Sequence, residues 1–280
     1  MAEASPKAPS LEPFDRALRR RRHAAALAGF GRADFLHAVI ADEIRERAAT
    51  VSRDFADVLD MGGPAPVWPG ATRLALSPGG GAAVVGDEDR LPFADASFDL
   101  VVSAGGLATV SDLPGALVQV RRVLKPDGLF LGSFAGGMSL AELRADLLAA
   151  ESAITGGAAA RVAPMVEAQA AASLMQRAGF AMPVADVERL TVRYSSLFGL
   201  LDDLTAMGAR SSLASRAPLR REVLAAAAER FQARAEADGK VSITIDVLHL
   251  AGWAPAPGQP VPLKPGSGTA SLAKALGSKI

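Results

Sequence analysis

The sequence predicts an α/β fold in which helices cover a largely parallel sheet, and three observations predict it. The chain has 280 residues, of which 50% are hydrophobic, which is enough for a sizeable core. An unbroken apolar run at residues 100–102 is typical of a parallel strand buried on both faces. A helix over residues 113–124 is followed by a strand over residues 129–134, and such alternation favours parallel strands joined by right-handed crossovers.

The composition excludes several classes of protein. Lys and Arg together number 30, and Asp and Glu also number 30, so the formal net charge is zero. This balance argues against non-specific nucleic-acid binding, which depends on neutralising phosphates. The absence of cysteine excludes disulfides and thiolate sites. No apolar run approaches the roughly 20 residues of a membrane helix, and no signal-peptide core is evident, so we predict a cytoplasmic protein without a transmembrane segment.

Before the apolar run at residues 100–102, we expect an arm, a helix and three short strands. Residues 1–13 contain three prolines and small polar residues, which predicts a flexible arm. The basic run from Arg19 to Arg22 indicates either a solvated helix face or a docking patch for an acidic partner. Apolar residues recur at helical spacing over residues 34–49. Strands are expected at residues 55–61, 73–76 and 83–85.

The second half continues the alternation after a turn at residues 125–128, where a helix ends at Lys-Pro-Asp-Gly. Helices are expected at residues 140–154, 166–178, 197–207 and 221–237, and strands at residues 184–194 and 241–250. Proline and glycine dominate residues 254–280, which predicts a loosely packed tail with one short helix near residues 272–276.

Several sequence motifs resemble those of known enzymes. Gly-Asp-Glu-Asp-Arg-Leu-Pro-Phe at 86–93, Ser-Phe-Asp-Leu-Val at 97–101 and Arg-Arg-Val-Leu-Lys-Pro-Asp-Gly at 121–128 resemble class I S-adenosylmethionine-dependent methyltransferases. Further segments resemble the respiratory complex I assembly methyltransferase-like family, which is related to the biotin-synthesis malonyl-carrier methyltransferases; they lie at 134–137, 140–144, 201–208 and 249–253, with the basic run at 19–22. The resemblance covers roughly residues 14–275.

The resemblance implies a Rossmann-like methyltransferase sheet of seven strands whose last strand is antiparallel. It also implies a helical lid over about residues 197–237, inserted before the last strand of a domain at 14–253. S-adenosylmethionine is the cofactor of such proteins. Open α/β sheets bind their ligands in a crevice at the carboxyl ends of the strands.

The sequence departs from the family pattern where the cofactor should be held. By resemblance, a G-x-G-x-G loop should follow the first strand, but prolines stand at 64 and 66 in place of the second and third glycines. Proline has no amide hydrogen, so two donors are lost. Ala75 occupies the position of the acid that should accept hydrogen bonds from the ribose, and no acidic residue lies between Met61 and Gly86.

The spacing between the first strands is also too short for the usual helices. Ten residues, 62–71, separate the first two strands and include three prolines. A parallel crossover with a helix takes a dozen or more residues, and prolines interrupt a regular helix. Residues 77–82 form a still shorter link with three consecutive glycines. We therefore expect both crossovers to be loops.

Six positions are equivalent by resemblance to cofactor-binding positions of the family: Asp60, Gly62, Gly63, Ala75, Asp87 and Ser103. Asp87 corresponds to the acid that contacts the adenine amine, although a turn aspartate that caps local amides is the structural alternative. Ala104, Ala108 and Thr109 replace an Asn and a His-Trp pair, which predicts a small apolar pocket.

Other candidate chemistry is sparse. His23, His37 and His249 lie far apart in the sequence without metal-ligand spacing, and packing or surface positions are expected for them. Tyr194 and Glu151 could face the crevice or the lid. Glu142 and Arg144 are two positions apart on a helix and should not pair. No P-loop, catalytic triad order or metal motif is present, so no catalytic residue or metal ligand is predicted.

Three functions remain open from the sequence. The first is a methyltransferase fold of the complex I assembly type that has lost its S-adenosylmethionine site and acts through a protein partner. The second is an active S-adenosylmethionine-dependent methyltransferase with a remodelled cofactor loop. The third is a protein that binds another small ligand in a dry pocket near Gly105 and Gly106.

Overall fold

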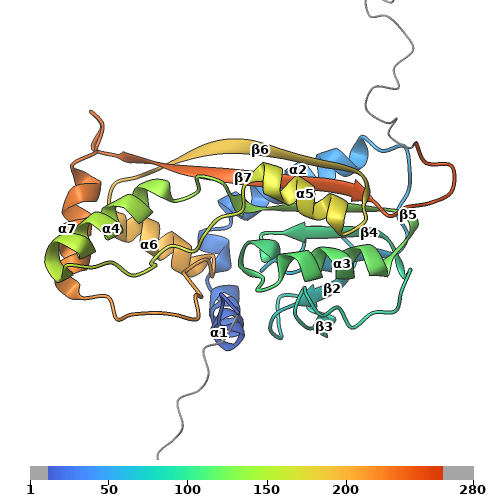
Figure 1. The fold of residues 1–280 in the computed structure, drawn as a ribbon, viewed down its shortest axis with the longest axis horizontal. Helices are drawn as coiled ribbons and strands as arrows, with labels where there is room; N and C mark the ends of the chain where they lie inside the picture. The colour runs from blue at the N-terminus through green and yellow to red at the C-terminus, as the bar shows by residue number, and fades with distance from the viewer. Residues whose placement is uncertain (1–11, 261–280) are drawn as a thin grey trace, which may run out of the picture.

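A seven-stranded sheet forms the centre of the molecule (Figure 1). The structure is a computed structural model, and it describes residues 12–260. The strand order is β3-β2-β1-β4-β5-β7-β6. The strands are β1 (Val58–Met61), β2 (Thr72–Ala75), β3 (Val84–Val85), β4 (Phe98–Ala104), β5 (Leu124–Gly136), β6 (Ala181–Tyr194) and β7 (Val241–Trp253). β1 to β5 pair in parallel, whereas β7 is antiparallel to both β5 and β6, which confirms the predicted methyltransferase sheet with its antiparallel last strand.

Helices cover both faces of this sheet because strand residues alternate between two apolar cores. The helices are α1 (Arg16–Leu27), α2 (Phe35–Ala49), α3 (Leu113–Val123), α4 (Ala141–Thr155), α5 (Ala168–Arg177), α6 (Leu197–Ala206) and α7 (Arg221–Gln232). Two short 3₁₀ helices span Phe30–Arg32 and Gly106–Thr109. Val102 of β4 packs in the core that contains α2, and Val101 packs in the core that contains α3 and α5.

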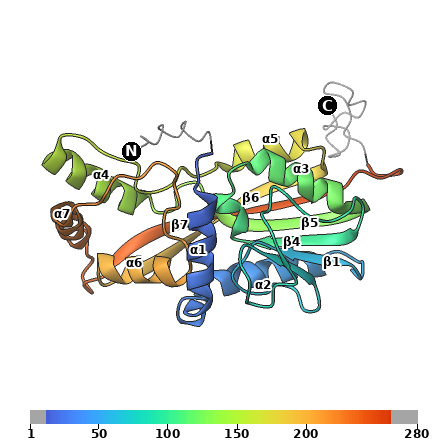
Figure 2. The ribbon, with the colours of Figure 1, turned by 90° about the horizontal axis from the view of Figure 1, so that it is seen from below.

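A helical lid follows the carboxyl end of β6. The helices α6 and α7 lie between β6 and β7 in the chain and form one group with α4. Leu200, Val223 and Phe231 bury their side chains in the same core as α2 and extend it beyond the sheet. Figure 2 shows α1 crossing the molecule between this lid and the sheet. The lid helices predicted for residues 197–237 are therefore present, inserted before the last strand.

The crossovers in the first half of the sheet are loops, as predicted. Residues 62–71 connect β1 to β2, and residues 76–83 connect β2 to β3, without a helix in either link. The proline-rich and glycine-rich sequences account for this, because neither composition supports a helix.

Some boundaries differ from the prediction. β5 begins at Leu124 and includes residues 125–128, where a turn was predicted; Asp127 has a φ of 62° and the register with β4 shifts there. The turn residues thus form an irregularity within a strand. α7 ends at Gln232 instead of near residue 237. The predicted helix at 272–276 lies outside the described residues. Among residues 12–260, no helix is both long and apolar enough to cross a membrane.

Candidate functional site

The carboxyl ends of β1 and β4 bring two glycines into contact. Gly62 follows β1 with a φ of 85°, a conformation that favours glycine. Gly106 follows β4, at the start of a 3₁₀ helix. A Cβ atom added to Gly62 would lie 3.1 Å from the Gly106 Cα. This is the edge of the sheet at which open α/β folds hold ligands.

The carboxylate of Glu88 occupies the space beside these glycines. A Cβ added to Gly62 would lie 2.5 Å from the Glu88 Oε1, and one added to Gly106 would lie 2.8 Å from the same oxygen. Glu88 is completely buried. The two glycines, which have no side chains, therefore leave room for the Glu88 side chain.

Arg19 of α1 neutralises that buried carboxylate. Its Nη1 and Nη2 donate to the Glu88 Oε2 and Oε1 at 2.7 and 2.6 Å, which is the bidentate geometry preferred by a guanidinium and a carboxylate. Its Nη2 also donates to the Gly106 carbonyl at 2.7 Å, and its Nε donates to the Thr109 Oγ1 at 2.9 Å. Arg19 is 6% exposed, so both charges are removed from water and satisfied by each other.

Two further arginines of α1 bind the acids on either side of Glu88. Arg16 donates to both carboxylate oxygens of Asp89 at 2.8 and 2.6 Å. Arg20 donates to Asp87 at 2.6 Å. Arg16 holds the pKa of Asp89 below its usual range, against the burial of that carboxyl, which acts to raise it. Asp87, the adenine-contact position by resemblance, is thus engaged by α1.

Charge holds α1 to the sheet more than apolar packing does. The helix contains five arginines and no acid, and Asp15 caps its first turn by accepting from the Leu18 amide at 2.9 Å. Its buried side chains are Arg19, His23 and Ala26, of which only Ala26 is apolar. We call residues 87–89, which follow β3, the acidic loop. Within the basic run from Arg19 to Arg22, Arg19 and Arg20 bind this loop, whereas the two arginines after them do not.

Asp60 at the end of β1 is capped by the loop that follows it. Its Oδ2 accepts from the amides of Val67 and Trp68 at 2.6 and 3.3 Å. Arg73 of β2 lies 3.5 Å from the same oxygen and donates to the Gly63 carbonyl at 2.6 Å. Burial raises the pKa of Asp60 and lowers the pKa of Arg73, although the mutual charge attraction opposes both shifts. These contacts fix the loop that contains Pro64 and Pro66.

Several buried polar atoms near Asp60 have no hydrogen-bond partner among the described residues. They are Asp60 Oδ1, Arg73 Nε and Nη1, Ser103 Oγ and His37 Nε2. Register places Asp60 beside Arg73, and Ser103 beside Met61. Buried polar atoms of this kind are commonly satisfied by ordered water or a ligand.

Two of the small apolar residues singled out in the sequence are buried, whereas Thr109 does not line an apolar pocket. Ala75 ends β2 and is fully buried, and it pairs with Val85 of β3. Ala104 at the end of β4 is also buried. The Thr109 hydroxyl accepts a hydrogen bond from Arg19, so this position is polar and already has a partner within the chain.

Two of the three histidines approach the same loop. His23 lies with its Nδ1 2.7 Å from the Ser77 Oγ and its Nε2 3.5 Å from the Gly63 carbonyl. The His37 Cε1 would lie 3.2 Å from a Cβ on Gly63. His249 is remote from this loop and lies 2.8 Å from the Ser133 Oγ. No group of metal-ligating side chains occurs within residues 12–260.

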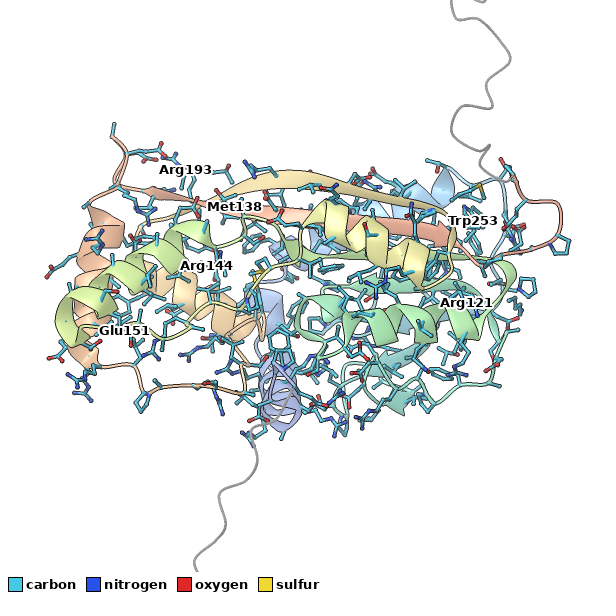
Figure 3. All side chains as sticks on the ribbon, viewed as in Figure 1. Arg121, Met138, Arg144, Glu151, Arg193 and Trp253 are labelled. Carbon is cyan, nitrogen blue, oxygen red and sulfur yellow. The ribbon has the colours of Figure 1, made fainter. Side chains whose placement is uncertain are left out.

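The remaining candidates have structural partners. Glu142 accepts from the Thr244 amide at 3.2 Å, whereas Arg144 donates to the Ala163 carbonyl, so the two do not pair. Glu151 of α4 pairs with Arg161 in the loop that follows this helix. Figure 3 shows Arg144 and Glu151 on α4. Burial raises the pKa of Tyr194, and the nearby charge of Asp203 adds to the shift.

Sequence reasoning missed the residues at the centre of this site. Arg19 is one of four adjacent arginines, and only the helix geometry shows that it points inward. Glu88 entered the sequence reasoning only as part of a family motif. Arg73 gave a usable signal, because a charged residue in a short, largely buried strand requires a partner.

Comparisons with known proteins agree with this architecture. A family model described as "Methyltransferase domain" matches residues 68–132. The arginine-hydroxylase NDUFAF5, mitochondrial, of Danio rerio is 33% identical over 286 residues, which cover 94% of this chain and 89% of that protein. The Mus musculus protein of the same name is 33% identical and covers 96% of this chain and 84% of its own length.

More distant similarities show the same fold. A malonyl-acyl-carrier-protein O-methyltransferase of Methylovorus sp. (strain MP688) is 35% identical over 62% of this chain and 57% of that protein. Among solved structures, the YcgJ protein from Bacillus subtilis has a TM-score of 0.50 at 16% identity, over 79% of this chain and 99% of that chain. At this identity the structural match indicates the fold alone.

The buried Arg19–Glu88 pair predicts a large stability cost when one partner is removed. Arg19→Met should lower the free energy of unfolding by about 3–5 kcal/mol, because it leaves the Glu88 charge buried and unpaired. Urea denaturation would measure the change. Arg21→Met, at an exposed position of the same helix, should stay within about 0.5 kcal/mol of the wild type.

A double variant separates the charge from the packing. Arg19→Met with Glu88→Leu removes both charges and should recover most of the loss, because apolar pairs often replace buried ion pairs without cost. An Arg19→Met variant as stable as the wild type would contradict the assignment of this pair as the centre of the site.

His37 predicts a pH dependence of stability. Burial lowers its pKa to about 4, from 6.5 in the unfolded chain, so the unfolded state binds protons more readily. The neutral His37 ring contributes to the free energy of unfolding in full above pH 6.5. This contribution is lost as the pH falls towards 4, by up to about 3 kcal/mol. A His37→Phe variant should lose less stability than the wild type across this window. Proton NMR of His37 should show a neutral ring at pH 5.5, and a normal pKa would contradict the assignment.

Proposed function

The chain belongs to the family of the arginine-hydroxylase NDUFAF5 proteins, and we propose that it is a member without a working S-adenosylmethionine site that acts through protein contacts. The observation that carries this proposal is the Arg19–Glu88 ion pair packed against Gly62 and Gly106. By resemblance to the methyltransferases, these glycines flank the position at which the cofactor lies in that fold.

The loop after β1 supports the proposal through its missing donors. Pro64 and Pro66 have no amide hydrogens, and the amides of Val67 and Trp68 are used by Asp60. The side chain of Ala75 cannot accept a hydrogen bond from a ribose. A nucleoside at this edge would therefore meet few of the donors and acceptors that bind one in relatives.

The acidic loop supports the proposal through its existing partners. To admit a ligand, α1 would have to release Arg19 from Glu88 and Arg20 from Asp87. Release of Arg19 would leave a buried carboxylate without its partner, which is costly. The residues present thus fit an adenosyl cofactor poorly, and this edge of the sheet is not arranged for methyl transfer.

From the sequence resemblance, we infer that the chain acts in the assembly of respiratory complex I. In that process it would bind a protein partner. Nucleic acid is disfavoured by the neutral net charge. A cytoplasmic location remains a prediction from the sequence.

One observation favours the alternative of an active methyltransferase with a remodelled site. The unpartnered Asp60 Oδ1 and Ser103 Oγ lie at the ends of adjacent strands, at family-equivalent positions. A small polar ligand could satisfy both atoms, as ordered water also could.

Titration calorimetry distinguishes these functions. We expect no saturable heat when S-adenosylmethionine or S-adenosylhomocysteine is titrated to about 1 mM, because the donors and the ribose acceptor are absent. Thermal unfolding in the same ligand should not shift, whereas ligand at about 100 times its dissociation constant would stabilise the fold by roughly 2.7 kcal/mol.

The positive control is the malonyl-acyl-carrier-protein O-methyltransferase from Methylovorus, measured under the same conditions. A micromolar dissociation constant of this chain for either ligand would contradict the proposal and favour an active methyltransferase with a remodelled site.

A second candidate function is recognition of arginine, since the relatives' names state an arginine-hydroxylase activity. The observation that favours it is the guanidinium site formed by Glu88, the Gly106 carbonyl and Thr109, which Arg19 fills. A carboxylate fork with two neutral acceptors is well suited to an arginine side chain.

Vacating this site tests the second candidate. A fluorescent pentapeptide with one central arginine should bind Arg19→Ala at least about tenfold more tightly than the wild type, because Glu88 becomes available. A lysine version of the peptide and the Arg21→Ala protein are the matched controls. Equal binding by wild type and Arg19→Ala would rule this candidate out.

A further inference from the structure

The outer side of α1 and the loop after α6 form a surface rich in arginine. We define the basic surface as Arg21, Arg22, Arg210 and Arg216. Arg21, Arg210 and Arg216 are exposed, and Arg22 is partly buried. The two segments meet where Arg22 donates to the Ser211 carbonyl.

The charge of this surface is not balanced locally. No acid occurs in α1, and none occurs in residues 204–221, which contain four arginines. Arg16, Arg19 and Arg20 are used by the acidic loop and leave the outer arginines of α1 without that partner. This local excess stands out in a chain whose formal net charge is zero.

Acidic partners on the basic surface are few. Arg216 pairs with Asp15 at 3.3 Å. Arg21 and Arg210 form no hydrogen bond or ion pair with another described residue.

The arginines of this surface also crowd one another. Burial lowers the pKa of Arg22, and the charges of Arg210 and Arg216 lower it further. Like charges held together in this way are relieved by an anion that neutralises them.

The backbone that carries the basic surface is fixed in place. The Asp15 amide donates to the Ser212 carbonyl at 2.8 Å, and the Ala214 amide donates to the Pro13 carbonyl at 2.9 Å. Phe14 and Leu213 pair as an antiparallel bridge between the two segments, and both side chains are buried. A partner would therefore bind a preorganised backbone and would order only the arginine side chains.

We propose that the basic surface is the docking site for an acidic segment of a partner protein. The guanidinium groups match carboxylates in charge and can bind them in bidentate geometry. The Arg216–Asp15 pair already shows one guanidinium–carboxylate contact at this surface, through a single nitrogen and a single oxygen. This inference rests on the proposed action through protein contacts and names the chemistry of the partner.

A membrane surface fits these observations less well. Basic segments that bind membranes commonly combine cations with exposed apolar side chains. Leu213, the large apolar residue between Arg210 and Arg216, is buried against Phe14 and is not available for insertion. An acidic polypeptide requires only the arginines.

Fluorescence anisotropy with a labelled peptide of ten glutamates tests the proposal on the full chain. The wild type should bind the peptide, and the affinity should fall as salt rises. The Arg21→Glu/Arg210→Glu variant should bind at least about tenfold more weakly, because two cations become anions at the contact. Neither position forms a hydrogen bond or an ion pair in the described part of the chain, so this variant should fold normally, which circular dichroism would verify.

The matched control is Arg177→Glu/Arg230→Glu, which makes the same change in net charge at the ends of α5 and α7. Its affinity should stay within about twofold of the wild type. An equal loss in both double variants would show a non-specific charge effect and overturn the proposal. The absence of binding by the wild type at low salt would also overturn it.

Vesicles with about 30 mol% phosphatidylserine in phosphatidylcholine test the other source of negative charge. If the wild type binds these vesicles through Arg21 and Arg210 but does not bind the glutamate peptide, the docking proposal is wrong. Cofactor titration remains an independent measurement. If the chain binds both the cofactor and the peptide, the proposal of a non-working cofactor site is wrong, whereas the docking proposal is supported.

Discussion

The buried pair between Arg19 and Glu88 is the constraint on which the rest of the site depends. Glu88 carries a charge into the space beside Gly62 and Gly106, where water is excluded. Such a charge requires a fixed counter-charge and further hydrogen bonds. Arg19 supplies the counter-charge, and Gly106 and Thr109 accept two more of its hydrogens. The position of α1 across the edge of the sheet follows from this requirement.

The same helix links the two halves of the molecule. Its inner arginines hold the acidic loop after β3, and the residues at its start pair with the loop after α6 (Figure 2). Because few apolar side chains of α1 are buried, these links are mostly ionic and hydrogen-bonded. This helix supplies the arginine beside Gly62 and Gly106 and also part of the basic surface. In our proposal, it therefore connects the loss of a cofactor site to the gain of a docking site.

Much of the fold could be predicted from the sequence, because strand and helix periodicity, the prolines at 64 and 66 and the short spacing after Met61 are local signals. The replacement of crossover helices by loops is the clearest case. The predicted turn at 125–128 failed because a turn motif can be absorbed as an irregular start of a strand, as the φ of Asp127 shows. The content of the site could not be predicted, since Arg19 and Glu88 are 69 residues apart and meet only through tertiary structure.

A crystal structure grown with a large excess of S-adenosylhomocysteine is the most direct measurement of the central claim. Our account predicts electron density for Arg19 in bidentate contact with Glu88, with Gly62 and Gly106 packed around the carboxylate. Density for an adenosyl ligand between Gly62 and Asp87, with Arg19 displaced from Glu88, would contradict it.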